Sequence, residues 1–518
     1  MAVILGLNTA HAGSSAALLV DGVPVAAIAE ERLNRRKYYG GFPTLSVLKC
    51  LEMAGLTFRD LDAVAIGRDS SANLSRKLMY VARHPSRLLN LLKIKARRKE
   101  LGDLKSLFMQ NFDLSPDELR FSQFNIEHHL AHAASAFYPS GWDEATGLTI
   151  DGSGDFVTCM FVAGRGKQIE ILKRIYVPHS LGSLYTMVSE FIGYPKYGDE
   201  GKVMGLAPLG SDRFHDEFAD IVKINQQGFQ LNSEYFVPFG ANQGMSIDKE
   251  GSVTLSRHFS KRMIDMFGEP REPRSELSQR DQDLAFAVQA VFEKVYLHLL
   301  PLLQESAPSD RLIMAGGCAL NSVANGKIFD LTPFQKTWIQ PAAGDDGLAL
   351  GAALYTHHAL HGNERTYTMS NAYLGPEYSE TEIRTALDKA NVPYKRLERQ
   401  PLLEATVAEI AKGNVVGWFQ GRMEWGPRAL GNRSILAHPG FPGMKNILNA
   451  RVKHRESFRP FAPAVLADRQ SEIFEQSHPS PFMLHVYKIR PPWRERLSAV
   501  NHEDNTGRLQ SVARDENP

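Results

Sequence analysis

The sequence has few cysteines and almost no net charge. Its 518 residues include only three cysteines, which lie far apart at Cys50, Cys159 and Cys318. This spacing excludes a disulfide framework and a cysteine-based zinc knuckle, and it fits a reducing compartment. The formal net charge is +1, so no global basic field attracts nucleic acid, and we do not expect a nucleic-acid partner.

Long apolar runs are also missing. No stretch of about eighteen consecutive apolar residues occurs, so we expect no membrane span. The apolar N-terminus is too short for a signal peptide and lacks its basic start, and together these features predict a cytoplasmic protein. A chain of 518 residues is too long for one core, so two or more domains are expected.

Short apolar segments and tight turns alternate in the N-terminal part. Three strands are predicted there, at residues 3–8, 15–20 and 23–29. The Asp21-Gly22 pair predicts a hairpin between the last two. A strand that ends at Asp151 precedes a second predicted hairpin, at residues 155–162 and 169–177. This repeat predicts two related α/β halves.

A histidine pair and a nearby aspartate form a candidate metal site. His128 and His132 lie four residues apart, so a helix would place both imidazoles on one face. About twenty residues later, Asp151 ends an apolar strand before a glycine turn. Two imidazoles and one carboxylate suit Fe(II), Zn or Mn better than Ca or Mg. The alternative is a helix with hydrogen-bonded histidines and no metal. His129 points away from the face of the pair and is expected either to support a metal ligand from outside the site or to be structural.

Two later strand-to-helix junctions can also hold ligands. A strand at residues 312–315 runs into Gly316 and Gly317, and backbone N–H groups at such a turn can hold a phosphate. Asp345 and Asp346 follow a predicted strand at residues 337–340. In open α/β sheets, ligands gather at such carboxyl ends of strands.

Arginine and lysine are concentrated beyond a predicted linker at residues 357–369. Six fixed cations fall in two motifs, GRMEWGPRALGNRS (421–434) and KHRESFRPF (453–461). Guanidinium forks match phosphate oxygens, and the neighbouring glycines let backbone come close, so a nucleotide or polyphosphate site is predicted. No P-loop pattern occurs, which excludes an ordinary P-loop NTPase.

Nine motifs in register along nearly the whole chain resemble one family, the O-carbamoyltransferases of the NodU/CmcH/TobZ type. They are GLNTAHAGSSAALLVDG, AEERLNRRK, HHLAHAASAFYPS, DGSGD, GKVMGLAPLG, MAGGCALNSVANG, QPAAGDDGLALGAAL, GRMEWGPRALGNRSIL and KHRESFRPFAP. The resemblance implies an α/β fold with a duplicated sugar-kinase/actin-like carbamoyl transfer domain at 1–360. A YrdC-like α/β domain that forms carbamoyl adenylate is implied at 370–518. Since the family usually continues further, we expect that domain to be C-terminally truncated and incomplete.

The resemblance also implies a reaction and its residues. Carbamoyl phosphate and ATP would form carbamoyl adenylate, and the carbamoyl group would pass to a hydroxyl of a small-molecule natural product, as in antibiotic biosynthesis. A metal, typically Fe²⁺, would be held by His128, His132, Asp151 and Asp345, with Asp346 as the alternative to Asp345. His11 is the candidate base. The implied nucleotide and carbamoyl phosphate ligands are Arg428, Lys453, Arg455, Arg459, Lys202, Gly316, Gly317 and Asn321; Arg422 and Arg433 are weaker candidates.

Two other functions stay open, a phosphotransferase on the sugar-kinase fold and a tRNA threonylcarbamoyl-transferase-like enzyme. The low net charge disfavours the second, although residues 76–105 are locally basic. That run favours either a solvated helix face or a surface for an anionic substrate or partner. We expect the hydroxyl acceptor to be recognised there and by residues 225–275, a polar segment predicted to be an irregular insertion. A homodimer is a further expectation.

Overall fold

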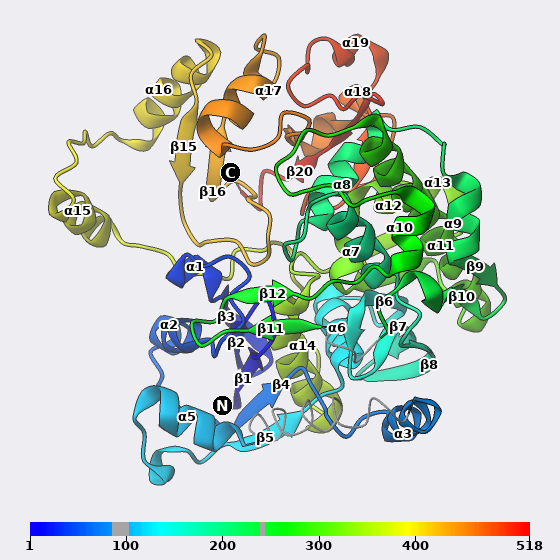
Figure 1. The fold of residues 1–518 in the computed structure, drawn as a ribbon. Helices are drawn as coiled ribbons and strands as arrows, with labels where there is room; N and C mark the ends of the chain where they lie inside the picture. Colours follow the sequence, from blue (N-terminus) through cyan, green and yellow to red (C-terminus); the bar gives the residue numbers. More distant parts are fainter. Residues whose placement is uncertain (85–102, 239–243, 518) are drawn as a thin grey trace. The chain divides into compact units, whose positions relative to one another are not determined.

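The computed structural model describes residues 1–84, 103–238 and 244–517. It divides into two compact units, Met1–Met369 and Ser370–Pro518. Both units combine helices with strands, so the fold is mixed α/β (Figure 1). Residues 85–102 of the basic run at 76–105 lie outside the described residues.

Two five-stranded sheets with the same topology form the first unit. Their orders are β3-β2-β1-β4-β5 and β8-β7-β6-β13-β14. In each sheet three strands form an antiparallel meander, and two later strands extend the first of them in parallel. The bounds are β1 Val3–Asn8, β2 Ser15–Val20, β3 Val23–Ala29, β4 Ala63–Ile66, β5 Ser122–Asn125, β6 Glu144–Gly154, β7 Val157–Arg165, β8 Gln168–Tyr176, β13 Arg311–Ala315 and β14 Lys336–Ile339. The sequence repeat therefore corresponds to a repeat in the fold.

The end of β6 differs from the prediction. The strand continues beyond Asp151 to Gly154, and its pairing with β7 is irregular between Ile150 and Gly154. Asp151 thus lies in a distorted stretch of strand rather than at its last residue. Two small residues, Gly152 and Gly154, allow that distortion, which alternation of apolar residues does not reveal.

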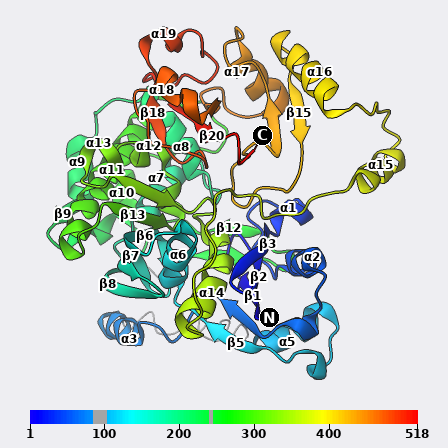
Figure 2. The ribbon, with the colours of Figure 1, turned by 180° about the vertical axis from the view of Figure 1, so that it is seen from behind.

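Two helices lie between the sheets. One of them contains His128 and His132 of the candidate metal site, and the other begins shortly after Asp345. α6 (His128–Phe137) packs on β6 and β13, α14 (Leu348–Tyr355) packs on β1, β2 and β4, and the two helices pack on each other. The views in Figures 1 and 2 show this central pair between the two sheets. A Cβ at Gly351 would lie 1.9 Å from the carbonyl oxygen of Ala131, so glycine is required for this close approach.

The outer faces of the sheets are covered by further helices. α2 (Thr44–Ala54) packs on β2 and β3, and α5 (Leu104–Phe112) contributes Leu104 and Phe108 to the same core. α7 (Leu181–Phe191) and α11 (Gln279–Ser306) pack on β6. Among the described helices, α11 alone has the length and apolar content to cross a membrane, a test that core helices also pass, and half of its apolar window is buried.

Two segments that were predicted to be irregular contain some ordered elements. The segment 225–275 contains β10 (Gly228–Leu231), the hairpin of β11 (Met245–Ile247) and β12 (Val253–Leu255), and α10 (Lys261–Phe267). Strands of three residues are too short to show an alternating pattern. The predicted linker at 357–369 begins as a π-helical turn with His357 and His358 buried.

The second unit is built from small sheets. β15 (Val416–Phe419) pairs with β16 (Arg433–Leu436), β17 (Ala464–Leu466) with β20 (Gln510–Val512), and β18 (Val486–Lys488) with β19 (Thr506–Arg508). Its helices α15 (Glu380–Lys389) and α16 (Arg399–Ala411) contribute no buried residue. The remaining α-helices and strands of the described residues are α1 Glu31–Asn34, α3 Leu74–Arg83, α8 Glu200–Leu206, α9 His215–Ile221, β9 Val222–Asn225, α12 Ser322–Gly326, α13 Ile328–Leu331, α17 Met444–Ile447, α18 Gln470–Ile473 and α19 Pro491–Arg494.

Candidate functional site

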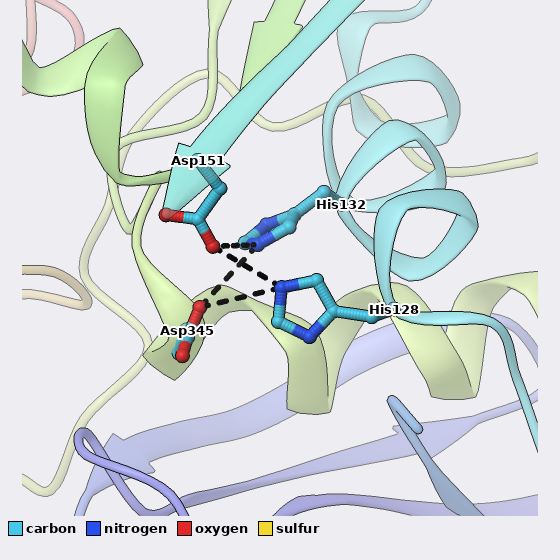
Figure 3. A group of neighbouring side chains, drawn as sticks. All are labelled: His128, His132, Asp151 and Asp345. Atoms are coloured by element: carbon cyan, nitrogen blue, oxygen red, sulfur yellow. Dashed lines mark hydrogen bonds and ion pairs between the residues drawn. The ribbon is translucent and has the colours of Figure 1, made fainter. Parts of the chain in front are cut away.

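The structure brings the four predicted metal ligands together. His128 and His132 project from α6 toward Asp151 of β6 and toward Asp345, which lies just before α14 (Figure 3). The candidate ligand atoms of all four residues lie within 4.8 Å of one another. His128, His132 and Asp345 are buried, and Asp151 is nearly so. The helix that follows the first sheet, a strand of the second sheet and the turn that follows the second sheet thus all contribute side chains to one cluster.

The spacing of the donor atoms fits a divalent metal. Nitrogen-to-oxygen distances of 3.1, 3.6, 3.5 and 3.5 Å separate the two histidine Nε2 atoms from Asp151 Oδ2 and Asp345 Oδ1. An edge of about 3.4 Å is expected for a tetrahedron of ligands at bond lengths of about 2.1 Å. His132 Nε2 and both carboxylate oxygens of Asp345 are buried without a hydrogen bond of normal geometry. Buried polar atoms left in this way indicate a missing ligand, so the cluster could bind a metal.

Each carboxylate is also held from outside the cluster. Asp151 Oδ1 accepts a hydrogen bond of 3.1 Å from the backbone N–H of Gly317. Asp345 Oδ2 faces Nδ1 of His11, whose side chain is partly exposed. Such outer contacts fix which oxygen of a carboxylate points at a metal. His11 therefore lies at the edge of the cluster, in direct contact with one candidate ligand.

The charges of the cluster are strongly coupled. Burial alone would lower the pKa of His132, but the adjacent carboxylates of Asp151 and Asp345 outweigh burial and raise that pKa to about 9. Burial opposes ionisation of Asp151 and Asp345 as well, yet the neighbouring histidines hold the pKa of both carboxyls below its usual range. In the absence of a metal, a protonated imidazole of His132 offsets one of the two carboxylate charges, and a divalent cation would offset both.

Asp346 and His129 lie outside the cluster. Burial, reinforced by the charge of Glu31, raises the pKa of Asp346 to about 7. His129 Nε2 donates to the carbonyl of Val157 at 3.1 Å, and its Nδ1 accepts from the Thr149 hydroxyl at 2.8 Å. Both ring nitrogens of His129 are thus satisfied, which fits the structural one of its two expected roles.

The other candidate residues of the first unit make contacts of their own. Asn321 caps α12 by accepting from the Ala324 N–H at 3.1 Å and also bonds to Gln289. Lys202 forms an ion pair of 2.9 Å with Asp199. The backbone N–H of Gly317 donates to Asp151, so the paired-glycine turn supports a candidate metal ligand. The sequence had indicated a phosphate-binding turn there and gave no sign of this contact.

A cluster of cations lies in the second unit. Burial and the charges of Arg428, Arg455 and Arg459 together lower the pKa of Arg508 well below its usual range. Burial and Arg459 likewise lower the pKa of Arg455 to about 10, and burial with both neighbouring arginines lowers that of Lys453. A group of cations that lower one another's pKa values favours an anionic ligand. We name Arg428, Lys453, Arg455, Arg459 and Arg508 the arginine cluster.

The two weaker candidates hold the local fold. Arg433 donates to the buried carboxylate of Glu424 at 2.8 Å, and Arg422 donates to the carbonyl of Leu374 at 2.7 Å. Glu424 also accepts the backbone N–H groups of Leu430 and Asn432. These contacts shape the loop that carries Arg428.

Sequence reasoning missed two residues beside these sites. Arg508 follows Gly507 but has no cation near it in the sequence, and its buried Nε makes no hydrogen bond to any described residue. Tyr197 lies near the metal cluster: burial, with Asp345 and Asp151, raises its pKa. For Tyr197 the available signal was its position in the glycine-rich stretch that contains Lys202.

The chain matches two family descriptions, Carbamoyltransferase N-terminus over residues 3–354 and Carbamoyltransferase C-terminus over residues 407–518. It therefore belongs to the carbamoyltransferase family of enzymes. It is 38% identical to an uncharacterised protein of Synechocystis sp., covering 100% of this chain and 88% of that protein. It is also 36% identical to Nodulation protein NolNO of Sinorhizobium fredii, over 98% of this chain and 71% of that protein.

More distant relatives include Nodulation protein U of Rhizobium tropici, which is 28% identical over 99% of this chain and 88% of its own length. Among solved structures, component A of (R)-2-hydroxyglutaryl-CoA dehydratase from Acidaminococcus fermentans aligns with a TM-score of 0.37 and 13% identity, over 70% of this chain and 100% of that one. HypF of T. kodakarensis aligns with a TM-score of 0.33 and 14% identity, over 70% and 48% of the chains. These scores are too low to assign a function.

Proposed function

We propose that the chain is an ATP-dependent O-carbamoyltransferase. Carbamoyl phosphate and ATP would form carbamoyl adenylate, and the carbamoyl group would pass to a hydroxyl of a small-molecule natural product. The observation that carries the proposal is the buried His/Asp cluster in a chain that matches both parts of the carbamoyltransferase family. The proposal includes a sugar-kinase/actin-like fold for the first unit and a YrdC-like fold for the second.

The proposed reaction has two stages, formation of carbamoyl adenylate and transfer of the carbamoyl group. Water releases phosphate from carbamoyl phosphate and leaves carbamate, whose oxygen attacks the α-phosphorus of ATP as pyrophosphate leaves. The hydroxyl oxygen of the acceptor then attacks the carbamoyl carbon, its proton is removed, and AMP leaves. Carbamate is a poor electrophile, and coupling to AMP supplies the leaving group. The adenylate hydrolyses readily, so the site must keep water away from it.

The transfer step is assigned to the first unit. His128, His132, Asp151 and Asp345 would hold a divalent metal, for which we propose Fe²⁺. When bound, the metal supplies a positive charge that neutralises the adenylate phosphate or polarises the carbonyl. His11 would remove the hydroxyl proton, because its Nδ1 faces Asp345, which leaves Nε2 to accept that proton.

The activation step is assigned to the arginine cluster of the second unit. Its guanidinium groups would bind the phosphates of ATP and carbamoyl phosphate. Lys202 and the turn at Gly316 remain proposed ligands in the first unit. Gly317 and Asn321 would first have to give up the contacts described above. A cytoplasmic location, the absence of a membrane partner and a homodimer are proposals that rest on the sequence.

The proposal is tested by the phosphate products. The full chain is incubated with Fe²⁺, ATP and carbamoyl phosphate, with and without an alcohol acceptor. We expect pyrophosphate that requires carbamoyl phosphate, and AMP that requires the acceptor; ADP with a phosphorylated acceptor would overturn the proposal in favour of a phosphotransferase. Arg508→Gln should reduce pyrophosphate release at least tenfold. Arg469→Gln, which removes an exposed ion pair with Glu472 in the same unit, is the control.

A further inference from the structure

A cavity of about 820 Å³ opens in the first unit, and Gly152 and Ser153, which follow the candidate ligand Asp151, form part of its wall. Its walls come from α3, from the end of β6, from β8 and the segment that follows it, and from β10 with the residues that follow it. This volume lies in the range of about 300–1,000 Å³ that is usual for small-molecule sites. The cavity therefore has the size for a hydroxyl acceptor.

The cavity reaches the strand that carries Asp151. Gly152 and Ser153, the two residues that follow this candidate ligand, form part of its wall. Ser180, another wall residue, donates to the carbonyl of Gly152 at 2.6 Å and accepts from the N–H of Ser183 at 3.0 Å. These bonds fix the wall to the metal-bearing strand. The cavity thus borders the two residues that follow Asp151 in β6.

The charge of the cavity is positive. Four fixed cations line it (Arg76, Arg83, Lys173 and Arg174), and none of its described lining residues is Asp or Glu. Glu127 neutralises Arg174 through an ion pair of 2.7 Å. The other three cations form no ion pair with a carboxylate in the described ranges 1–84, 103–238 and 244–517. A site with three uncompensated cations and no carboxylate favours an anionic ligand.

Aromatic rings lie among these cations. The guanidinium of Arg76 stands 4.9 Å from the centre of the Tyr176 ring, and Tyr80 packs edge-on against Phe156 at 5.6 Å. Ring faces beside donors suit the apolar face of a sugar ring or another flat group. His179 Nδ1 accepts from the Leu231 N–H at 3.1 Å, so its Nε2 carries the hydrogen and is a donor.

The two sequence segments that were expected to recognise the acceptor meet at this cavity. The described part of the basic run supplies Arg76 and Arg83, and the 225–275 segment supplies Phe229 and Phe236. We propose that the cavity is the acceptor site and that the acceptor is a hydroxyl compound bearing a phosphate, sulfate or carboxylate group beside a sugar-like ring. This inference rests on the proposed function, since it assigns the acceptor of that reaction.

The test is a calorimetric binding series on the full chain with glucose 6-phosphate, glucuronate and glucose. We expect both anionic sugars to bind at least tenfold more tightly than glucose. The double variant Arg83→Gln/Lys173→Gln should lose at least tenfold in affinity for the anionic sugars and none for glucose. The matched control is Lys77→Gln/Lys223→Gln, which removes one cation from the same helix and one from β9, neither of which lines the cavity. It should bind like the wild type.

Both double variants keep the arginine cluster intact. A loss of affinity in Arg83→Gln/Lys173→Gln alone therefore shows that the anionic sugars bind in this cavity and not at the arginine cluster. Equal binding of glucose and its phosphate, no binding of either anionic sugar, or unchanged binding by Arg83→Gln/Lys173→Gln in a chain with a wild-type melting temperature would overturn the inference. If that variant unfolds at a lower temperature, Arg76→Gln takes its place and is judged in the same way. Failure of the proposed function is separate: it would appear as no carbamoyl-phosphate-dependent pyrophosphate release by the wild type.

Discussion

Each carboxylate of the candidate metal centre divides its oxygens between two roles. Asp151 and Asp345 each direct one oxygen at the histidine pair, while the other oxygen meets Gly317 N–H or His11. The ligands are therefore oriented before any metal arrives. This arrangement lowers the cost of ordering the site on binding.

A prediction for a single residue concerns Arg508. Buried among like charges, it raises the free energy of the arginine cluster when no anion is present. We expect Arg508→Met to raise the melting temperature of the ligand-free protein and to remove most of the stabilisation that ATP gives the wild type. That stabilisation is about 2.7 kcal/mol at ATP concentrations of about 100 Kd. Scanning calorimetry with and without ATP measures both effects; equal stabilisation of the two proteins by ATP would argue against the cluster as its site.

At the scale of single residues, the sequence identifies those site residues whose partners are close to them in the chain. His128 and His132 were found from their spacing, because one helical turn brings them together. Asp345 required the family resemblance, since it reaches the site only through the packing of α14 on α6. Arg508 was missed because the cations that act on it, Arg428, Arg455 and Arg459, lie at least 49 residues away in the sequence.

At the scale of elements, the irregular end of β6 decides how closely α6 approaches. A Cβ at Gly154 would lie 2.0 Å from Cγ of His128, whereas a Cβ at Gly152 meets nothing within 4 Å. We expect Gly154→Ala to displace the His128 ring and weaken Co²⁺ binding about 10- to 100-fold. Gly152→Ala, in the same turn, should bind Co²⁺ like the wild type. Titrations followed by the absorption of bound Co²⁺ compare the two, and equal affinities would contradict the geometry.

Local periodicity predicted the long elements and failed for the short ones. β1, β2 and β3 have the predicted bounds because apolar alternation and the Asp21-Gly22 turn both act within a few residues. β11 and β12 carry three residues each, too few for a pattern. His358 was assigned to a linker, but its ring packs 4.7 Å from that of Tyr138, a contact that no local signal encodes.

At the scale of the molecule, the repeat was readable because the same succession of strands occurs twice, and both sheets have one topology. The second unit was less readable. Its parallel pair joins Ala464 to Gln510, which are far apart in sequence, through strands of three residues. Such pairings depend on tertiary packing and leave no mark in hydrophobic periodicity.

Acid stability provides a prediction for the whole protein. Burial, with the nearby His478, lowers the pKa of His485 to about 3. The unfolded chain would bind a proton here below about pH 6.5 that the folded chain excludes down to about pH 3, so stability is present above pH 6.5 and falls with pH in that window. His485→Gln should flatten the pH dependence of the free energy of unfolding by about 1.4 kcal/mol per pH unit. Urea unfolding at several pH values tests this, with the exposed His215→Gln as the control that keeps the wild-type slope.

The central claim is that a metal at the His/Asp cluster serves carbamoyl transfer while activation takes place in the other unit. The most direct test compares His132→Ala with His129→Ala for bound metal, pyrophosphate release and transfer to an acceptor. We expect His132→Ala to lose its metal and at least a hundredfold in transfer, yet to keep carbamoyl-phosphate-dependent pyrophosphate release. His129→Ala, which removes two structural hydrogen bonds, should lose about 1–3 kcal/mol of stability and keep its metal. Unchanged metal content in His132→Ala, or full transfer without metal, would contradict the account.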